Sequence, residues 1–114
     1  MSLADDFNPD IKSEKREKTV ESYLKDQVKR IGGLCLKFVS PGFSGVPDRL
    51  IVYKGVVAFV EVKRPGKRPR KLQQIQIELL KSHGVPALSV SSKEQVKALL
   101  DKLVNREDLL HAKI

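Results

Sequence analysis

Several residue types are scarce in this 114-residue chain, and each scarcity excludes a class of site. The single cysteine, Cys35, rules out an intrachain disulfide and fits a reducing compartment. One cysteine and two histidines, His83 and His111, are too few for a tetrahedral zinc site of the usual Cys/His kind. Because Cys35 lies within an apolar run, we expect it to pack in the core.

Long apolar runs are also missing. No stretch approaches the length needed to cross a bilayer, and residues 1–6 lack the basic-then-apolar plan of a secretory signal. Hydrophobic residues make up 40% of the chain and charged residues 32%, which argues against wholesale disorder. The sequence therefore predicts one globular domain in a cytoplasmic, intracellular protein.

Acidic residues are outnumbered by basic ones. The chain has 22 Lys and Arg against 14 Asp and Glu, a net charge of +8, which favours a polyanionic partner such as nucleic acid. The segment 63–71 holds six basic residues and no acidic one. Such a run is often only a solvated loop, but here we expect contacts with phosphate groups, which would make binding sensitive to salt. Beyond Lys63, the residues expected to contact DNA in this segment are Arg64, Lys67, Arg68, Arg70 and Lys71.

Hydrophobic periodicity predicts three helices. Residues 1–12 are expected to form a flexible tail, with Ser13 as the N-cap of the first helix. The second helix is expected between Pro69 and Gly84, and the third after Ser91 as the first residue of a capping box. The residues expected on the apolar face of the second helix are Leu72, Ile75, Ile77, Leu79 and Leu80.

Four short runs rich in β-branched and aromatic residues predict strands. These runs occupy residues 34–39, 50–53, 56–60 and 85–90. The turn Lys54-Gly55 joins the second and third runs and predicts an antiparallel hairpin. The order of helix, three strands, helix, strand and helix predicts an α/β fold in which helices flank a central mixed sheet.

Two acidic residues, Asp48 and Glu61, flank this hairpin. Antiparallel pairing brings the start of one strand close to the end of the next, so both carboxylates would converge at one edge of the sheet. Because side chains alternate along a strand, Lys63 would project from the same face as Glu61. Carboxylates this close raise each other's pKa unless a cation neutralises them, and oxygen ligands suit Mg²⁺. The pattern indicates a metal-dependent nuclease site.

Hydrolysis of a phosphodiester needs an activated water, neutralised transition-state charge and a stabilised leaving oxygen. One or two Mg²⁺ ions held by Asp48 and Glu61, with the Val62 carbonyl as a further ligand, would supply these functions. The ammonium of Lys63 would orient the water or help deprotonate it. Arg49, next to Asp48, is a candidate phosphate contact.

Three further side chains are candidates for the site, each with a structural alternative. Glu17 and Glu21 lie one turn apart on the first helix, where either would reach the cation or face solvent. Gln73 would hydrogen-bond a metal-bound water or a phosphate oxygen, or else occupy an ordinary exposed helix position. His83 is assigned to the end of its helix, where it satisfies carbonyls, and not to catalysis.

These motifs together carry a family resemblance. With Gly45-Val46-Pro47-Asp48, Glu61-Val62-Lys63 and Leu72-Gln73 in this order, the chain resembles the PD-(D/E)XK nuclease superfamily. More narrowly, it looks like a small standalone phage-type member of the virus-type replication-repair nuclease (VRR-NUC) family. The likeness covers roughly Glu14 to Leu103. It implies a restriction-endonuclease-like αβββαβ core and a nuclease domain at 13–114.

The resemblance also implies an activity, a DNA endonuclease that depends on Mg²⁺ or Mn²⁺. Asp48 and Glu61 match the metal ligands, Lys63 the catalytic lysine and Gln73 the family's glutamine. An acidic residue on the first helix belongs to the same pattern, for which we prefer Glu21 to Glu17.

Small standalone members resemble Holliday junction resolvases, which implies a homodimer acting on branched DNA. Two other readings stay open. One is a non-catalytic basic module that binds nucleic acid, and the other is a nuclease of the same fold that cuts flaps or nicks.

Overall fold

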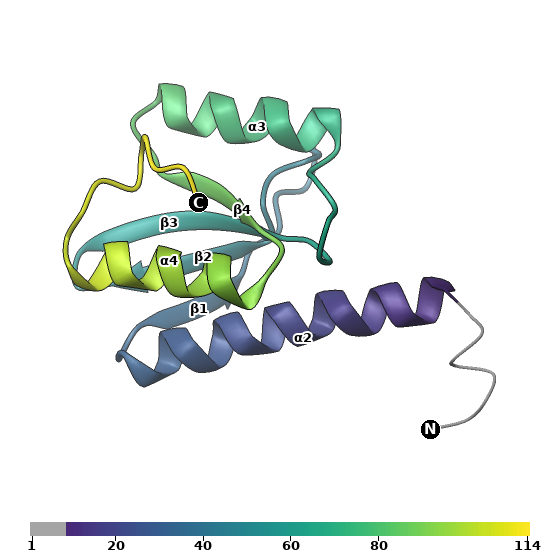
Figure 1. The fold of residues 1–114 in the computed structure, drawn as a ribbon. Coiled ribbons are helices and arrows are strands. Elements are labelled where there is room, and N and C mark those ends of the chain that lie inside the picture. The colour runs from purple at the N-terminus through teal and green to yellow at the C-terminus, as the bar shows by residue number, and fades with distance from the viewer. Residues whose placement is uncertain (1–8) are drawn as a thin grey trace.

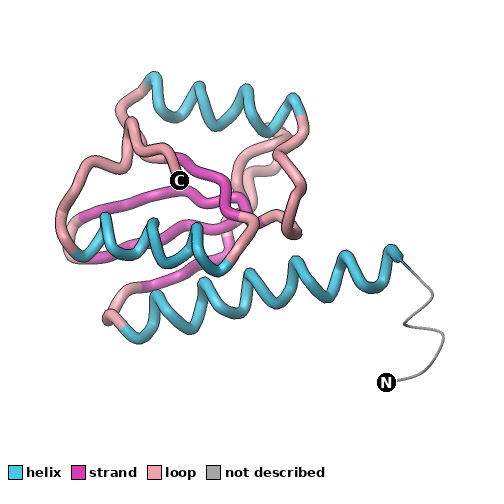
Figure 2. The backbone as a smooth tube through the Cα atoms, in the orientation of Figure 1, coloured by secondary structure: helices cyan, strands magenta, loops and turns pink. Residues whose placement is uncertain are grey.

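The computed structural model describes residues 9–114, with side chains from Glu17 onward. This part of the chain forms three α-helices around a four-stranded sheet (Figures 1 and 2). The elements are α2 (Pro9–Arg30), β1 (Leu34–Lys37), β2 (Arg49–Tyr53), β3 (Val56–Val62), α3 (Lys71–Ser82), β4 (Ala87–Val90) and α4 (Lys93–Val104). The predicted α/β fold and its order of elements are confirmed.

The first helix begins earlier than predicted. It starts at Pro9 and not after Ser13, so residues 9–12 of the expected tail are helical. Residues 1–8 lie outside the described part of the chain. Proline suits a first helical position because its fixed φ fits the helix and its missing N–H would have no partner there. At the other end Gly32, with φ of 85°, takes the left-handed conformation that ends the helix.

The sheet is mixed, as predicted. Its strands lie in the order β1-β2-β3-β4, with antiparallel pairing from β1 to β3 and parallel pairing of β3 with β4. Lys54 and Gly55 both have positive φ, 44° and 83°, as a two-residue type I′ hairpin turn requires. This turn pairs Tyr53 with Val56 and so fixes the register of the whole β2–β3 hairpin.

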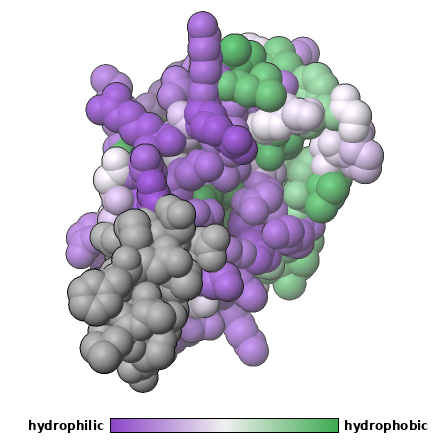
Figure 3. All heavy atoms as spheres, turned by 90° about the vertical axis from the view of Figure 1, so that its right-hand side faces the viewer, coloured by the Kyte–Doolittle hydropathy of each residue, from purple (hydrophilic) through white to green (hydrophobic). Residues whose placement is uncertain are grey.

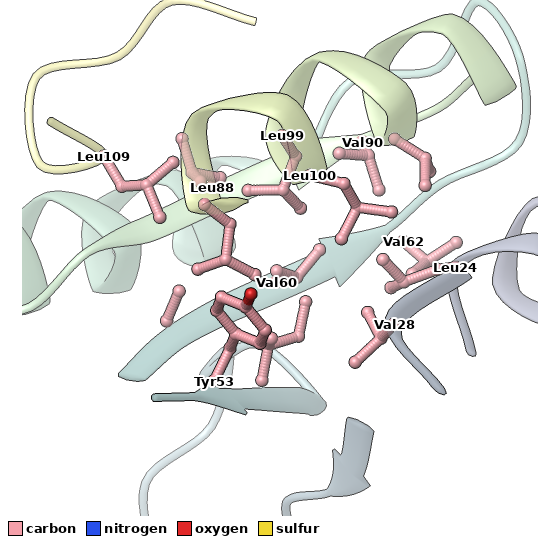
Figure 4. Close-up of a cluster of buried hydrophobic side chains, with 14 of the residues drawn as sticks. Leu24, Val28, Tyr53, Val60, Val62, Leu88, Val90, Leu99, Leu100 and Leu109 are labelled. Atoms are coloured by element: carbon pink, nitrogen blue, oxygen red, sulfur yellow. The ribbon is translucent and has the colours of Figure 1, made fainter. Parts of the chain in front are cut away.

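One face of the sheet packs against α2 and α4 and forms the core (Figure 4). Alternate strand residues face this layer, each contributing roughly 1.5–3 kcal/mol when fully buried. The strands supply Ile51, Tyr53, Ala58, Val60, Val62, Leu88 and Val90. The helices supply Val20, Leu24, Val28, Val96, Leu99, Leu100 and Leu103. Cys35 is half-buried against this cluster, as predicted. Within residues 9–114, no helix is both long enough and apolar enough to span a bilayer.

The predicted cap of α4 is displaced by one residue. Ser92 and not Ser91 is the N-cap, and its hydroxyl accepts a hydrogen bond from the Gln95 N–H at 3.1 Å. Likewise α3 begins at Lys71, two residues after Pro69, with Arg70 as its N-cap. These shifts leave the order of elements unchanged.

The apolar face predicted for α3 is wrong at three of its five residues, while Ile77 is buried and Leu80 is half-buried. α3 lies on the other side of β4 from α4 (Figure 1), and the residues that it buries are Gln73, Gln76 and Ile77. Leu72, Ile75 and Leu79 are instead 47%, 52% and 41% exposed. The side of α3 that packs on the protein is therefore formed largely by glutamines, and most of its apolar residues lie beside that side.

Candidate active site

The hairpin register brings Asp48 and Glu61 to opposing positions. Arg49 pairs with Val60, so the next position along the ladder sets Asp48 beside Glu61 on the same face of the sheet. The Phe38 N–H donates to the Asp48 carbonyl at 2.8 Å, which continues the β1–β2 ladder up to the acid. The predicted convergence of the two residues at one end of the hairpin is therefore observed.

Glu61 is a buried carboxyl group, 7% exposed. Its pKa is raised from an ordinary 4.5 to about 7, first because burial disfavours the charged form and then because of the negative charge of Asp48. The ammonium of Lys63, 3.7 Å from Glu61 Oε2, opposes this rise without cancelling it. The positive charge near Glu61 is therefore too small to offset its burial and the repulsion from Asp48.

Each of the two acids has one ammonium nearby. Lys63 is largely buried, and its backbone N–H donates to the Val90 carbonyl at 2.8 Å, which fixes it to β4. Asp48 has Lys37 Nζ at 3.7 Å from its Oδ2. Lys37 was missed by sequence reasoning, although its place at the end of the strand paired with β2 puts it within reach of Asp48.

Glu21 and Arg49 form an ion pair away from these acids. The Arg49 guanidinium donates to Glu21 Oε1 through Nε at 3.1 Å and also through Nη2. Burial would lower the pKa of Arg49, but the hydrogen bond and charge of Glu21 raise it above its ordinary value. Arg49 is 9% exposed and alternates with Asp48, so it faces the core layer. Arg49 and Glu21 therefore bond to each other on the core side of the sheet, and the phosphate contact of Arg49 and the ligand role of Glu21 stay predictions.

Of the two candidate acids on α2, Glu17 is the one whose charge affects Glu61. It lies one turn before Glu21, is half-exposed, and its negative charge contributes to the raised pKa of Glu61. Glu17 is therefore a stronger candidate than predicted, and the choice between the two glutamates as the metal ligand stays a prediction. Periodicity could not decide this, because both residues lie on the same side of the helix.

Gln73 is buried and holds the start of α3. Its Oε1 accepts a hydrogen bond from the Arg70 backbone N–H at 2.9 Å, as in a capping box. The alternative of an ordinary exposed position is therefore wrong. Gln73 ties the end of the basic segment to the helix that follows it.

The basic segment surrounds a hollow next to β4. Of its residues, Arg64 is half-buried, while Lys67, Arg68, Arg70 and Lys71 are exposed. The hollow has a volume of about 400 Å³ and is lined by Gly66, Lys67, Arg68, Pro69, Ser89, Ser91 and Gln95. Ser89 pairs with Glu61 across β3 and β4, so the hollow adjoins the acids. Figure 3 views this side of the molecule, and hydrophilic side chains dominate its left and centre.

The donor atoms for a metal ion are few. Among the side chains that the structure describes, from Glu17 to Ile114, no group of three or more His, Cys, Asp and Glu residues is arranged to hold one. Asp48 and Glu61 supply two carboxylates of the hard-oxygen type that Mg²⁺ and Mn²⁺ prefer. A cation here would therefore need backbone or water oxygens as well.

Comparison with known proteins identifies the family. No family model matches the chain. A solved structure described as a VRR_NUC domain is 33% identical, covers 75% of this chain and 95% of its own, and superposes with a TM-score of 0.70. The chain belongs to the VRR-NUC family. The predicted restriction-endonuclease-like αβββαβ core is thereby confirmed.

A phage protein is also similar to this VRR-NUC chain. "Putative nuclease p44" of Acyrthosiphon pisum secondary endosymbiont phage 1 is 49% identical over 59 residues. The match covers 51% of this chain and 63% of the phage protein. The VRR-NUC chain thus spans less than two thirds of the length of that relative.

Proposed function

We propose that this VRR-NUC protein is a divalent-metal-dependent endonuclease that hydrolyses phosphodiester bonds in DNA. The observation that carries the proposal is the opposition of Asp48 and Glu61, with Lys63 on the same face. A buried carboxyl group whose pKa is raised by a second carboxylate is costly without a cation, and such groups concentrate at functional sites. The name of the phage relative and the family of the solved neighbour point to the same activity.

The Val62 carbonyl is the backbone oxygen that we propose as a third ligand. The Phe38 N–H donates to the Asp48 carbonyl, so the backbone N–H and C=O of Asp48 face β1. Those of Arg49, the next residue along the strand, therefore face β3. Two residues further along the ladder, the next hydrogen-bonding positions would be Pro47 and Val62. Proline has no N–H, so position 47 has nothing to donate to that carbonyl. The proline before Asp48 would thereby leave an oxygen free beside the two carboxylates.

The metal set in this proposal is Asp48, Glu61 and the Val62 carbonyl, with Glu17 approaching from α2. Bound Mg²⁺ or Mn²⁺ would neutralise the carboxylates and supply Lewis-acid assistance to hydrolysis. Lys63, whose ammonium is held close to Glu61, would orient the attacking water and offset negative charge on the scissile phosphate. Gln73 would affect DNA binding indirectly. Its hydrogen bond with the Arg70 N–H holds the end of the basic segment, residues 63–71, at the start of α3.

DNA is the substrate that the surface charge favours. Arg64, Lys67, Arg68, Arg70 and Lys71 would contact phosphates on either side of the scissile bond, because their segment begins directly after Lys63. We further propose that the enzyme selects branched DNA of the four-way type and acts as a homodimer, which would present two sites to one junction.

The test is a cleavage panel of linear, flap, splayed and four-way DNA, each with and without Mn²⁺. The wild-type chain should cut only with the ion and should cut four-way DNA best. Asp48→Ala and Lys63→Ala should lower the rate at least 100-fold and leave DNA binding largely intact. Asp101→Ala and Lys97→Ala, which change exposed residues of α4, serve as matched controls.

Metal binding has a readout separate from cleavage. Mn²⁺ should raise the unfolding temperature of the wild-type chain and of Asp101→Ala, and should not raise that of Asp48→Ala. Full cleavage by Asp48→Ala would discard the site assignment. Binding without cleavage under every divalent ion would instead favour a basic binding module, and preference for flaps or nicks would discard the junction specificity.

A further inference from the structure

The loop that joins β1 to β2 exposes an aromatic ring to solvent. Phe43, in this loop, is 48% exposed. The other aromatic residues whose side chains the structure describes are each buried or half-buried, namely Tyr23, Phe38, Tyr53 and Phe59. Two of them, Phe38 and Phe59, pack edge to face with 5.1 Å between their ring centroids. Phe43 thus differs from them in presenting a large apolar ring to water, where a ligand with a flat apolar face would gain by covering it.

The loop holds this ring in a fixed position. Gly42, with φ of 81°, follows a proline, and the Phe43 N–H donates to the Ser40 carbonyl at 3.2 Å, as in a type II turn. On the other side of the ring, the Ser44 carbonyl accepts a hydrogen bond from Gln76 Nε2 at 3.1 Å. Little conformational freedom is therefore left to lose when the ring meets a ligand, which favours binding.

The ring lies close to the acids and to the basic segment. Phe43 is five residues from Asp48, so their Cα atoms are at most about 18 Å apart, or about five nucleotide steps. The loop and the basic segment both reach the start of α3 (Figure 1), where a Cβ on Gly45 would lie 2.8 Å from Leu72 Cγ. DNA that contacts the basic segment and the acids would therefore pass within reach of the ring.

A DNA base is the ligand that this surrounding favours. Between Lys37 and Asp48 the loop has no charged residue, so no acid in it would repel phosphates. Every base has a π-face on which an aromatic ring stacks, and one such contact is worth roughly 5- to 150-fold in affinity. In an intact duplex the bases already stack on one another, and separating them has a cost. A ring therefore gains most where the DNA is already unstacked, as at a branch point.

We propose that Phe43 stacks on an unstacked base of branched DNA, within about five nucleotides of the scissile phosphate, and thereby sets a preference for branched over linear DNA. This deepens the proposed function and rests on DNA being its substrate. The basic segment supplies affinity that is common to every DNA structure, whereas the ring supplies a contact that distorted DNA makes more readily. Selection by shape then needs no reading of base sequence.

Binding measurements in EDTA test the ring without cleavage. By fluorescence anisotropy, the wild-type chain should bind four-way DNA more tightly than linear duplex of equal length. Phe43→Leu keeps an apolar side chain but removes the ring, so it should weaken binding to four-way DNA at least about fivefold and leave binding to linear duplex nearly unchanged. Phe43→Trp should keep the preference. Val104→Leu, which changes a similarly exposed apolar residue of α4, should behave as wild type.

Tryptophan fluorescence reports the stacking directly. The natural chain has no tryptophan, so Phe43→Trp carries a single indole. At saturation, four-way DNA should quench its emission more strongly than linear duplex does, because a stacked base quenches indole fluorescence. Val104→Trp should show no such difference between the two DNAs. A urea midpoint equal to that of the wild-type chain shows that each variant is folded.

Several outcomes would overturn the stacking. They are equal binding of both DNAs by the wild-type chain, an undiminished preference in Phe43→Leu, and equal quenching of Phe43→Trp by both DNAs. A loss of preference that comes with a changed sedimentation mass would also overturn it, because Phe43 would then contact protein. The nuclease proposal fails separately. A chain that discriminates through Phe43 but never cuts DNA leaves the stacking standing, and cleavage with an undiminished preference in Phe43→Leu leaves the nuclease standing.

Discussion

At the scale of single residues, the site consists of acidic groups that the fold holds close enough to repel each other. Glu61 is buried beside Asp48, and its ordinary preference for the ionised form is reduced. Arg49, one position from Asp48 along the chain, is fully matched by Glu21 on the opposite side of the sheet. The adjacent residues Asp48 and Arg49 thus belong to two different charge clusters. Asp48 and Glu61 repel each other, which favours a functional role, whereas Arg49 and Glu21 attract each other, which favours folding.

Glu61 should make the metal-free protein less stable as the pH rises. Its folded pKa of about 7 lies above the ordinary 4.5, so its contribution is fully favourable below pH 4.5 and is lost as the pH passes 7. The loss is on the order of 3 kcal/mol. In EDTA, the urea midpoint of the wild-type chain should fall from pH 5 to pH 8, and that of Glu61→Gln should stay nearly constant. Asp101→Asn should behave as wild type, and an equal fall in Glu61→Gln would contradict the assignment.

The two glutamates of α2 should separate stability from activity. Glu21→Gln leaves the buried Arg49 guanidinium without its charge partner and should cost on the order of 2 kcal/mol in urea unfolding. Glu17→Gln removes a charge that repels Glu61, so it should not destabilise the protein but should lower metal-dependent cleavage at least tenfold. The opposite outcome, with Glu21→Gln inactive but stable, would restore Glu21 as the ligand.

At the scale of elements, the hairpin could be predicted and the packing of α3 could not. A two-residue turn flanked by β-branched runs sets a register, and the register alone puts Asp48 beside Glu61. In α3 the apolar positions mark an apolar stripe but not what covers it. Gln73 and Gln76 are buried because their amides bond to backbone groups of Arg70 and Ser44, contacts that no periodicity encodes.

The loop before Asp48 should be sensitive at one glycine and tolerant at another. Gly42 and Gly45 have φ of 81° and 86°, so alanine is strained at both, by on the order of 1 kcal/mol. A Cβ at Gly42 meets nothing within 4 Å, whereas at Gly45 it lies 2.8 Å from Leu72 Cγ and 3.2 Å from the Leu72 carbonyl. Gly45→Ala should therefore lower stability by about 2 kcal/mol more than Gly42→Ala. Urea unfolding measures both, and equal losses would show that α3 does not constrain the loop.

At the scale of the whole molecule, polar and apolar surfaces are separated. The basic segment and its hollow adjoin one end of the sheet face, and the exposed apolar residues Leu34, Leu36 and Val57 lie along the rest. Composition predicted the first of these, because the net charge of +8 is concentrated in a single segment. It could not predict the second, since hydrophobic residues look alike in sequence whether they face a core or a partner.

The basic segment should bind DNA through phosphates and without regard to base sequence. Lys67→Ala and Arg68→Ala should each weaken binding several-fold and reduce the slope of log affinity against log salt by about 1. Lys97→Ala, on α4, should change neither quantity. Fluorescence anisotropy in EDTA at several salt concentrations measures both. An unchanged slope in the first two variants would place the DNA elsewhere.

The turn at Lys54-Gly55 lies at the opposite end of the hairpin from the acids, yet it decides whether they meet. Asp48 and Glu61 are equidistant from it in the chain, so lengthening both strands by the same number of residues would preserve their encounter. One extra residue on a single side would invert the alternation and turn one carboxylate toward the core layer. The position of each acid is thus set by its distance from the turn. Insertions that lengthen both strands equally are those that keep Asp48 opposite Glu61.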